Sequence, residues 1–214
     1  MEVSDMNYEE VVSNAQVYGL YESVKGSKYP MAVDLSKVTE EVTERTKKLA
    51  NAKTGSGHDN FLNGIVVQFD LTFTNKAWVE AERYHFLDFI SSQSTMHRIT
   101  KFDLDKAYIS FVDPRIIEIM KEKVKEYNNL QEDIARLQEE GKDTSTLNDV
   151  SKNKYLEILY SNPAGFKLTA RMTTNYRQLK TIYFQRRDHR LPEWRAFCKW
   201  IETLPHAEFI IGEE

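Results

Sequence analysis

The strongest constraint on the fold is the segment 65–73, IVVQFDLTF, in which every second side chain is apolar and the side chains between them are polar except for Val66. A period of two is typical of a β-strand with one buried face, because successive side chains point to opposite sides of the backbone. The face predicted to be buried consists of Ile65, Val67, Phe69, Leu71 and Phe73. The segment therefore predicts a sheet strand packed against a hydrophobic core.

Apolar residues at helical spacing predict helices around this strand. Helices are expected over 8–18, over 34–52 with Ser36 as N-cap, over 114–140 and over 173–187, with a last helix from Pro192. A further helix is expected from about Lys76, with Trp78, Ala81, His85 and Phe89 on one face. Loops are expected at 19–30 and 54–60, a break at the small polar residues 91–95, and a short strand at 207–211. The long helix from Pro114, followed by a mobile tip at 141–153, predicts a helical hairpin arm or a subunit contact.

Length and composition are typical of a globular protein with one domain. A chain of 214 residues can bury on the order of 70% of its unfolded surface, so folding needs no disulfide or metal. The single cysteine, Cys198, excludes a disulfide framework and a cysteine-rich zinc module. No apolar run approaches the ~20 residues of a membrane span, and the acidic N-terminus carries no secretory signal. We therefore expect a cytoplasmic protein with no membrane partner.

Charge is distributed unevenly along the chain. The formal net charge is −4, yet the nine Lys and Arg between Phe166 and Lys199 face only two acids, Asp188 and Glu193. This segment carries +7 and the remainder −11. Such polarity predicts an anionic ligand or an acidic neighbouring subunit, or else only a solvated basic helix face.

Several common active sites are absent from the sequence. It has no GxGxxG, GxxxxGK[ST], HExxH or GxSxG motif, and its five histidines lack metal-ligand spacing, so no metal is predicted. The acidic total argues against a nucleic-acid partner. A single-stranded nucleic-acid binder would have to stack bases on aromatic residues of the basic segment, namely Tyr176, Tyr183, Phe184 and Trp194.

Two polar clusters are candidates for a binding site, and the first is Arg83-Tyr84-His85 followed by SSQSTMHR at 91–98. Such a loop can surround a phosphate with N–H and O–H donors while Arg98 supplies charge. The alternative is an ordinary helix C-terminus, where Arg and His complement the helix dipole and the serines form the turn.

The second cluster lies in the basic segment and includes Asn175, Arg177, Arg186 and His189. Arg186 shares a helical stripe with apolar residues that should face the core. A partly buried guanidinium requires an anionic or carbonyl partner, because an unpaired buried charge costs several kcal/mol. That partner is either the nearby Asp188 or a ligand, such as a nucleotide phosphate or a pyrimidine oxygen.

Residues 162–197, NPAGFKLTARMTTNYRQLKTIYFQRRDHRLPEWRAF, resemble the C-terminal motif block of flavin-dependent thymidylate synthases, the ThyX family. That family has an Asn-x-Arg at a helix start, an Arg on the same helix, and a His- or Gln-rich turn leading to a Glu. Asn175, Arg177, Arg186 and His189 match these places. Upstream, a GHxxxF-type loop at 57–61, the strand, a helix and the segment 83–94 follow in the family's order. The resemblance covers about two-thirds of the chain and is to short, divergent members common in phages of low-GC bacteria (Firmicutes).

Three departures from the family pattern affect the expected activity. The Arg-His-Arg signature is only partly kept at 83–94, and its Asn-Glu pair is replaced by Ser-Ser or Ser-Gln. Leu159 stands where the family has a nucleotide-binding Arg, and Thr181 replaces an Asn. Two alternatives therefore stay open, a related dUMP hydroxymethylase and a catalytically inactive ThyX-like nucleotide-binding protein.

The resemblance implies an α/β (α+β) fold of ThyX type, with a small sheet, several helices and a protruding helical hairpin. It implies one domain over 1–214 with a helical arm at about 114–152, and a homotetramer whose FAD sites are built from several subunits. The implied enzyme converts dUMP to dTMP with methylenetetrahydrofolate and NADPH. Reduced flavin delivers hydride to the pyrimidine, so no covalent nucleophile is required and Cys198 is expected in the core.

The resemblance also implies a role for each candidate residue. Arg186 would be catalytic, polarising the pyrimidine and holding the nucleotide. The substrate's phosphate would be bound by Gln93, Ser94 and Arg98. The residues expected to contact FAD are Arg83, Tyr84, His85, Asn175, Arg177 and His189.

Overall fold

The computed structural model describes residues 6–53 and 55–212, and the chain divides into two compact units. Of the described residues, the first unit comprises 6–53, 55–73, 77–92 and 169–212, and the second comprises 74–76 and 93–168. Each unit is described by itself. No helix of the described residues is both long enough and apolar enough to cross a bilayer.

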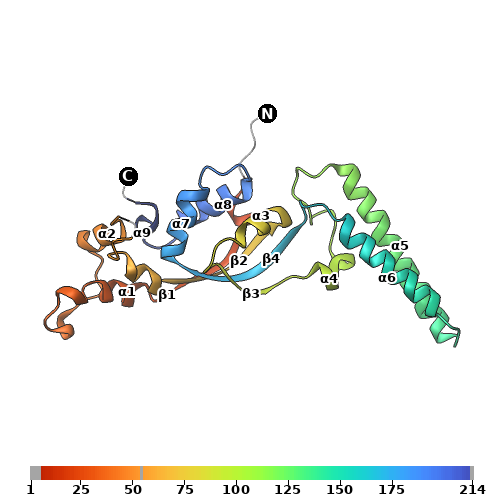
Figure 1. The fold of residues 1–214 in the computed structure, drawn as a ribbon, viewed down its shortest axis with the longest axis horizontal. Helices are drawn as coiled ribbons and strands as arrows, with labels where there is room; N and C mark the ends of the chain where they lie inside the picture. The colour runs from red at the N-terminus through yellow and green to blue at the C-terminus, as the bar shows by residue number, and fades with distance from the viewer. Residues whose placement is uncertain (1–5, 54, 213–214) are drawn as a thin grey trace. The chain divides into compact units, whose positions relative to one another are not determined.

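The first unit is built on a four-stranded sheet with the strand order β1-β2-β4-β3 (Figure 1). The strands are β1 (Val12–Tyr18), β2 (Val66–Thr74), β3 (Asp88–Ser92) and β4 (Lys167–Asn175). β1 pairs antiparallel with β2, and β3 pairs antiparallel with β4. The predicted strand is confirmed, because all five residues of its apolar face are completely buried. The mixed α/β fold class is likewise confirmed.

Helices α3 (Asn75–Ala81), α7 (Tyr176–Arg186) and α8 (Pro192–Ile201) lie against one face of this sheet (Figure 1). The core between them is aromatic: Phe73 lies 4.8 Å from Trp194 and Phe69 lies 4.7 Å from Trp200, measured between ring centroids. Contacts of this kind add about 0.5–1.5 kcal/mol per pair beyond the burial of area. The other helices of the unit are η1 (Tyr8–Glu10), α1 (Leu20–Ser27), η2 (Tyr29–Met31), η3 (Leu35–Lys37), α2 (Glu44–Ala50), η4 (Asn60–Gly64) and α9 (Glu208–Ile211).

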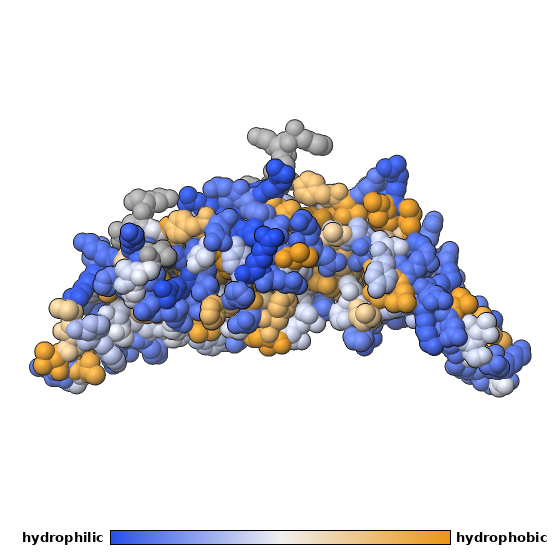
Figure 2. Space-filling model, viewed as in Figure 1, coloured by the Kyte–Doolittle hydropathy of each residue, from blue (hydrophilic) through white to orange (hydrophobic). Residues whose placement is uncertain are grey.

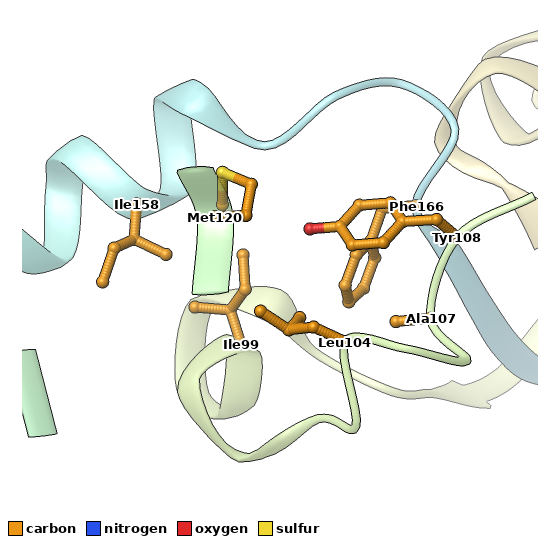
Figure 3. Close-up of a cluster of buried hydrophobic side chains, with 7 residues drawn as sticks. All are labelled: Ile99, Leu104, Ala107, Tyr108, Met120, Ile158 and Phe166. Carbon is orange, nitrogen blue, oxygen red and sulfur yellow. The ribbon is translucent and has the colours of Figure 1, made fainter. Parts of the chain in front are cut away.

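The second unit has its own hydrophobic core beside a helical hairpin. Its helices are α4 (Thr95–Arg98), η5 (Ile99–Lys101), α5 (Pro114–Glu139) and α6 (Ser145–Ser161). Figure 3 shows the buried cluster, which consists of Ile99, Leu104, Ala107, Tyr108, Met120, Ile158 and Phe166. The Phe166 ring lies 5.1 Å from Phe102 and 5.3 Å from Tyr108.

The predicted long helix is confirmed as α5. The side chain of Asp113 accepts a hydrogen bond from the Arg115 N–H as N-cap, and Pro114 occupies the first turn. Past its end, Gly141 adopts a left-handed φ of 71°. The expectation of a mobile tip at 141–153 is wrong beyond Thr144, since α6 starts at Ser145 and pairs with α5 through Tyr127 and Tyr155, whose rings are 5.2 Å apart.

Two expectations near the N-terminus are wrong. Residues 12–18 form strand β1 rather than a helix, because pairing with β2 outweighs their weak helical pattern. Asn14, at φ 51°, lies within the register shift of this pair. Residues 20–27, expected to be a loop, form α1 and bury Leu20 and Val24.

The remaining corrections concern element ends. The helix expected over 34–52 is regular only from Glu44 to Ala50, where Thr43 and Thr46 form a capping box. The helix expected from Lys76 ends at Ala81, and Phe89 belongs to strand β3. Strand β4 extends through residue 175, so the helix expected from 173 begins at Tyr176. Residues 208–211 are helical, not a strand.

Candidate functional site

The best-defined polar site in the first unit surrounds Arg186, the last residue of α7. The Asn175 side chain caps this helix by accepting a hydrogen bond from the Gln178 N–H at 3.0 Å. Leu179 and Ile182 lie on the same stripe as Arg186 and are completely buried, which draws the guanidinium toward the core. Only 12% of the Arg186 side chain is exposed.

The anionic partner of this guanidinium is Glu80 of α3. Nη1 of Arg186 donates to Glu80 Oε2 at 2.8 Å, and Nε donates to the Tyr84 hydroxyl at 2.7 Å. That hydroxyl in turn donates to Gln185 Oε1 at 2.9 Å. The alternative partner expected from the sequence is wrong, since the Asp188 side chain is 91% exposed and lies 3.4 Å from Nε of Arg187 instead.

Two aromatic rings pack against the Arg186 guanidinium. Its central carbon lies 4.8 Å from the centroid of the Trp194 ring and 5.4 Å from that of Tyr84. Trp194 is completely buried, so the cation–π attraction acts away from water, where it contributes about 2 kcal/mol.

His189 completes this cluster. Its Nε2 lies 2.7 Å from Arg186 Nη1 and 3.2 Å from Glu80 Oε2, while Nδ1 lies 3.2 Å from the Leu191 nitrogen. Arg186 Nη1 can only donate, so at 2.7 Å it requires the lone pair of Nε2, and a neutral ring that accepts at Nε2 does not donate from it to Glu80. Burial and the neighbouring charge of Arg186 lower the pKa of His189, which keeps the ring neutral.

One edge of the Arg186 guanidinium remains open. Nε and Nη1 are bonded, but Nη2 has no hydrogen-bond partner among the described residues. Two N–H donors on a fixed, slightly exposed cation can bind a carbonyl or phosphate oxygen of a ligand.

Asn175 and Arg177, the other predicted residues at α7, make contacts at the start of the helix, away from Arg186. Nη1 of Arg177 donates to Asn60 Oδ1 at 2.8 Å, and its Nη2 lies 3.6 Å from the buried Asp59 carboxylate. The amide of Asn175 is used in capping. The start of α7 is thereby joined to the loop at 57–61, nine residues along the helix from Arg186.

Arg83 and His85 follow α3 and are exposed. Neither side chain has a hydrogen-bond or ion-pair partner within 6–53 and 55–212. The next residue, Phe86, is held at φ 86°, a conformation that costs a non-glycine residue about 1–3 kcal/mol. Strained backbone of this kind is common beside ligand sites.

Gln93, Ser94 and Arg98 belong to the second unit. Ser94 precedes α4, and its carbonyl accepts the Arg98 N–H at 3.1 Å. Its hydroxyl makes no capping bond. The Arg98 side chain is exposed.

Of the predicted residues, the structure brings together Tyr84, Arg186 and His189. Sequence reasoning missed Glu80. Glu80 could have been found as an acid within the apolar face of α3 and four residues before Tyr84, a spacing that places both on one side of a helical turn.

The basic charge of the C-terminal third is distributed over separate local contacts. Arg171 lies 3.3 Å from Asp70, and Arg195 donates to the carbonyls of His189 and Arg190. Of the four aromatic residues considered for stacking, Tyr176, Tyr183 and Trp194 are buried, and Phe184 alone is exposed to a base.

Cys198 lies in the core, and burial raises the pKa of its thiol to about 12, which makes it a poor nucleophile. Within the described part of the chain, no group of three His, Cys, Asp or Glu is placed to hold a metal ion. A pocket of about 650 Å³ lies between residues 27–39 and α2, and a groove of about 1150 Å³ follows the helical hairpin. The pocket contains no predicted site residue, whereas the groove is lined in part by Met96 and His97 of the polar cluster at 91–98.

Comparison with known proteins gives similarity at the level of the fold. No protein-family model and no curated protein sequence matches the chain. Among solved structures, the flavin-dependent thymidylate synthase ThyX from Helicobacter pylori, complexed with FAD and dUMP, matches with a TM-score of 0.61 and 14% identity over 94% of this chain and 97% of that one. A second structure of Thymidylate Synthase X from Helicobacter pylori with FAD and dUMP has a TM-score of 0.59 and 14% identity over 94% and 96% of the two chains. The chain therefore has the fold of these ThyX structures.

Proposed function

We propose that this protein is a FAD-dependent enzyme that methylates dUMP at C5, using methylenetetrahydrofolate and NADPH. The observation that carries the proposal is the Arg186 guanidinium, held by Glu80, Tyr84 and Trp194 with Nη2 open. It is supported by a fold shared with enzymes crystallised with FAD and dUMP. The motif order of the short, divergent ThyX members agrees with it.

Arg186 is proposed to bind the pyrimidine through Nη2. Two N–H donors aimed at a ring carbonyl stabilise negative charge that develops on the oxygen during attack at the ring. Bound FAD would supply the hydride. The chain's own contribution is to orient the nucleotide and to exclude water around a guanidinium that is already fixed.

The nucleotide phosphate is proposed to bind Gln93, Ser94 and Arg98. The Ser94 hydroxyl is not used for capping, and Arg98 is exposed, so both groups can reach an anion. A charged guanidinium with a hydroxyl donor is a common combination for phosphate.

The residues present fit FAD in part. Arg83 and His85 are exposed and uncommitted among the described residues, and the Arg177 side chain retains 32% exposure beside Asn60. These groups, with Asn175 next to them at the start of α7, are proposed to hold the anionic and polar parts of FAD. Tyr84 and His189 already bond to the Arg186 cluster, so we propose that they act through Arg186 rather than on the flavin.

The homotetramer implied by the resemblance is proposed to form through exposed apolar side chains. Figure 2 shows an apolar patch at the segment after α1, where Tyr29, Met31, Val33 and Leu35 are exposed. The edge strand β3 also exposes Phe89 and Ile90. Apolar patches of this kind mark contact surfaces, and light scattering of the purified protein measures the oligomer directly.

The experiment that tests the proposed function is a visible spectrum of the freshly purified protein, followed by titration with dUMP. Flavin bands, or their appearance after reconstitution with FAD, and formation of dTMP from dUMP in the presence of methylenetetrahydrofolate and NADPH are the expected results. A colourless protein that FAD cannot reconstitute would refute the flavoenzyme.

A second candidate is a ThyX-like nucleotide-binding protein without activity. It is favoured by Leu159, which packs against the core of the second unit at the position of a nucleotide-binding Arg. It predicts thermal stabilisation by dUMP without dTMP formation. A hydroxymethylase would instead release hydroxymethyl-dUMP, which mass spectrometry distinguishes from dTMP.

A further inference from the structure

We infer that Glu80 is a positioning residue for Arg186, whose carboxylate fixes the guanidinium so that Nη2 is presented to the pyrimidine. The inference rests on the proposed function, because it concerns how the same arginine meets its ligand. Glu80 itself needs no contact with the nucleotide.

The guanidinium is fixed at three places. Nη1 is held by Glu80 Oε2 at 2.8 Å, Nε by the Tyr84 hydroxyl at 2.7 Å, and one face lies over Trp194. Because a guanidinium is rigid and planar, two fixed nitrogens and one covered face also determine the direction of the third nitrogen. The ligand would then meet a donor pair that loses little conformational entropy on binding.

The charge of Glu80 matters as much as its geometry. Its Oε2 accepts from Arg186 Nη1 at 2.8 Å, and an ionised carboxylate accepts from a guanidinium more strongly than a neutral amide oxygen does. The side chains of Glu80 and Arg186 are 16% and 12% exposed, so water screens the pair weakly. Glu80 therefore neutralises most of the cationic charge while Nη2 keeps its donors, which suits a neutral ring carbonyl better than a phosphate.

If Glu80 had a purely structural role, its ion pair would join α3 to α7 without affecting how Arg186 binds the nucleotide. The two roles differ in a double-mutant cycle, because a residue that acts through Arg186 loses its effect on binding once Arg186 is removed. They also differ in the mobility of the guanidinium itself, which hydrogen exchange of the Arg186 Nε–H measures by NMR without any ligand.

The test uses the full chain with Glu80→Gln, Arg186→Ala, the double variant, and Glu82→Gln, an exposed acid two residues away, as control. Calorimetry is expected to show that E80Q weakens dUMP binding by about tenfold in the wild-type background and by less than about twofold in the R186A background. Exchange of the Arg186 Nε–H should accelerate by about tenfold in E80Q and stay unchanged in E82Q. Where E80Q does not fold, Glu80→Asp moves the carboxylate by one methylene and serves in the same measurements.

Unchanged Nε–H exchange in the Glu80 variant overturns the inference. An equal loss of dUMP affinity in both backgrounds also overturns it, because Glu80 would then act elsewhere. If the wild-type chain itself does not bind dUMP, the proposed function fails, and the exchange measurement alone decides whether Glu80 fixes Arg186.

Discussion

The carboxylate of Glu80 lies 2.8 Å from Nη1 of Arg186, although 106 residues separate the two in the sequence. This pair joins the helix after β2 to the helix after β4, beside the buried ring of Trp194. It satisfies the charge of Arg186 without using all of its donors. A buried cation with an open edge is the feature on which the proposed binding of a pyrimidine depends.

Replacing Arg186 by Ala is expected to weaken dUMP binding by at least about 100-fold, since the open donor pair is lost. The chain should remain folded, with a free energy of unfolding lower by about 3 kcal/mol, because Glu80 keeps its buried charge without its main partner. Calorimetry and urea unfolding measure the two effects. Adding E80Q to R186A should recover part of the stability. Unfolding of R186A with no recovery in the double variant would indicate a structural role for Arg186 alone.

The hydroxyl of Ser94 is expected to contribute to phosphate binding but not to stability. Ser94→Ala should weaken dUMP binding by about tenfold, which is the effect of one lost charge-assisted hydrogen bond. The melting temperature of the S94A variant should equal that of the wild type, because the Ser94 side chain makes no capping bond. Ser110→Ala, an exposed serine of the same unit, is the control. Unchanged affinity of S94A would place the phosphate elsewhere.

Stability is expected to depend on pH through His189. Its environment includes Glu80, Arg186, Glu193 and Arg195, and burial together with Arg186 lowers its pKa from the ordinary 6.5. The unfolded chain therefore binds a proton more readily than the folded chain. The contribution of neutral His189 to the free energy of unfolding is fully present above pH 6.5 and is lost as the pH falls through the lowered pKa of the folded state.

Urea unfolding at about pH 5 to 8 measures this dependence for the wild type and for His189→Gln, which keeps a polar side chain that does not titrate. The wild type should lose more stability than H189Q on acidification. Identical pH profiles for the two proteins would show that His189 does not titrate differently in the folded state.

Two glycines of the first unit provide a matched pair. Gly19 has φ 69°, and an added Cβ would lie 2.6 Å from the Gly64 carbonyl oxygen. Gly19→Ala is therefore expected to lower the free energy of unfolding by about 1–3 kcal/mol. Gly26 lies in α1 with open space around it, and Gly26→Ala should raise stability by about 0.5 kcal/mol. Thermal unfolding distinguishes the pair, and equal effects would contradict the observed turn at Gly19.

Local patterns were sufficient for the long and strongly periodic elements. The alternation at 65–73, the helix from Pro114 and the apolar helix from Pro192 were all predicted, because each pattern repeats several times within one element. The position of Arg186 on the buried stripe with Leu179 and Ile182 followed from the same helical spacing.

Only the tertiary structure determined the short strands and the partners of the site. Strands β1, β3 and β4 are stabilised by hydrogen bonds to neighbours distant in the chain, and their side-chain patterns are too short or too polar to predict them. Local charge suggested Asp188 for Arg186, yet packing of α3 against α7 brings Glu80 instead. The physical reason is that a local pattern reports which face of an element is buried, whereas the residue that meets a buried charge depends on which other element covers that face.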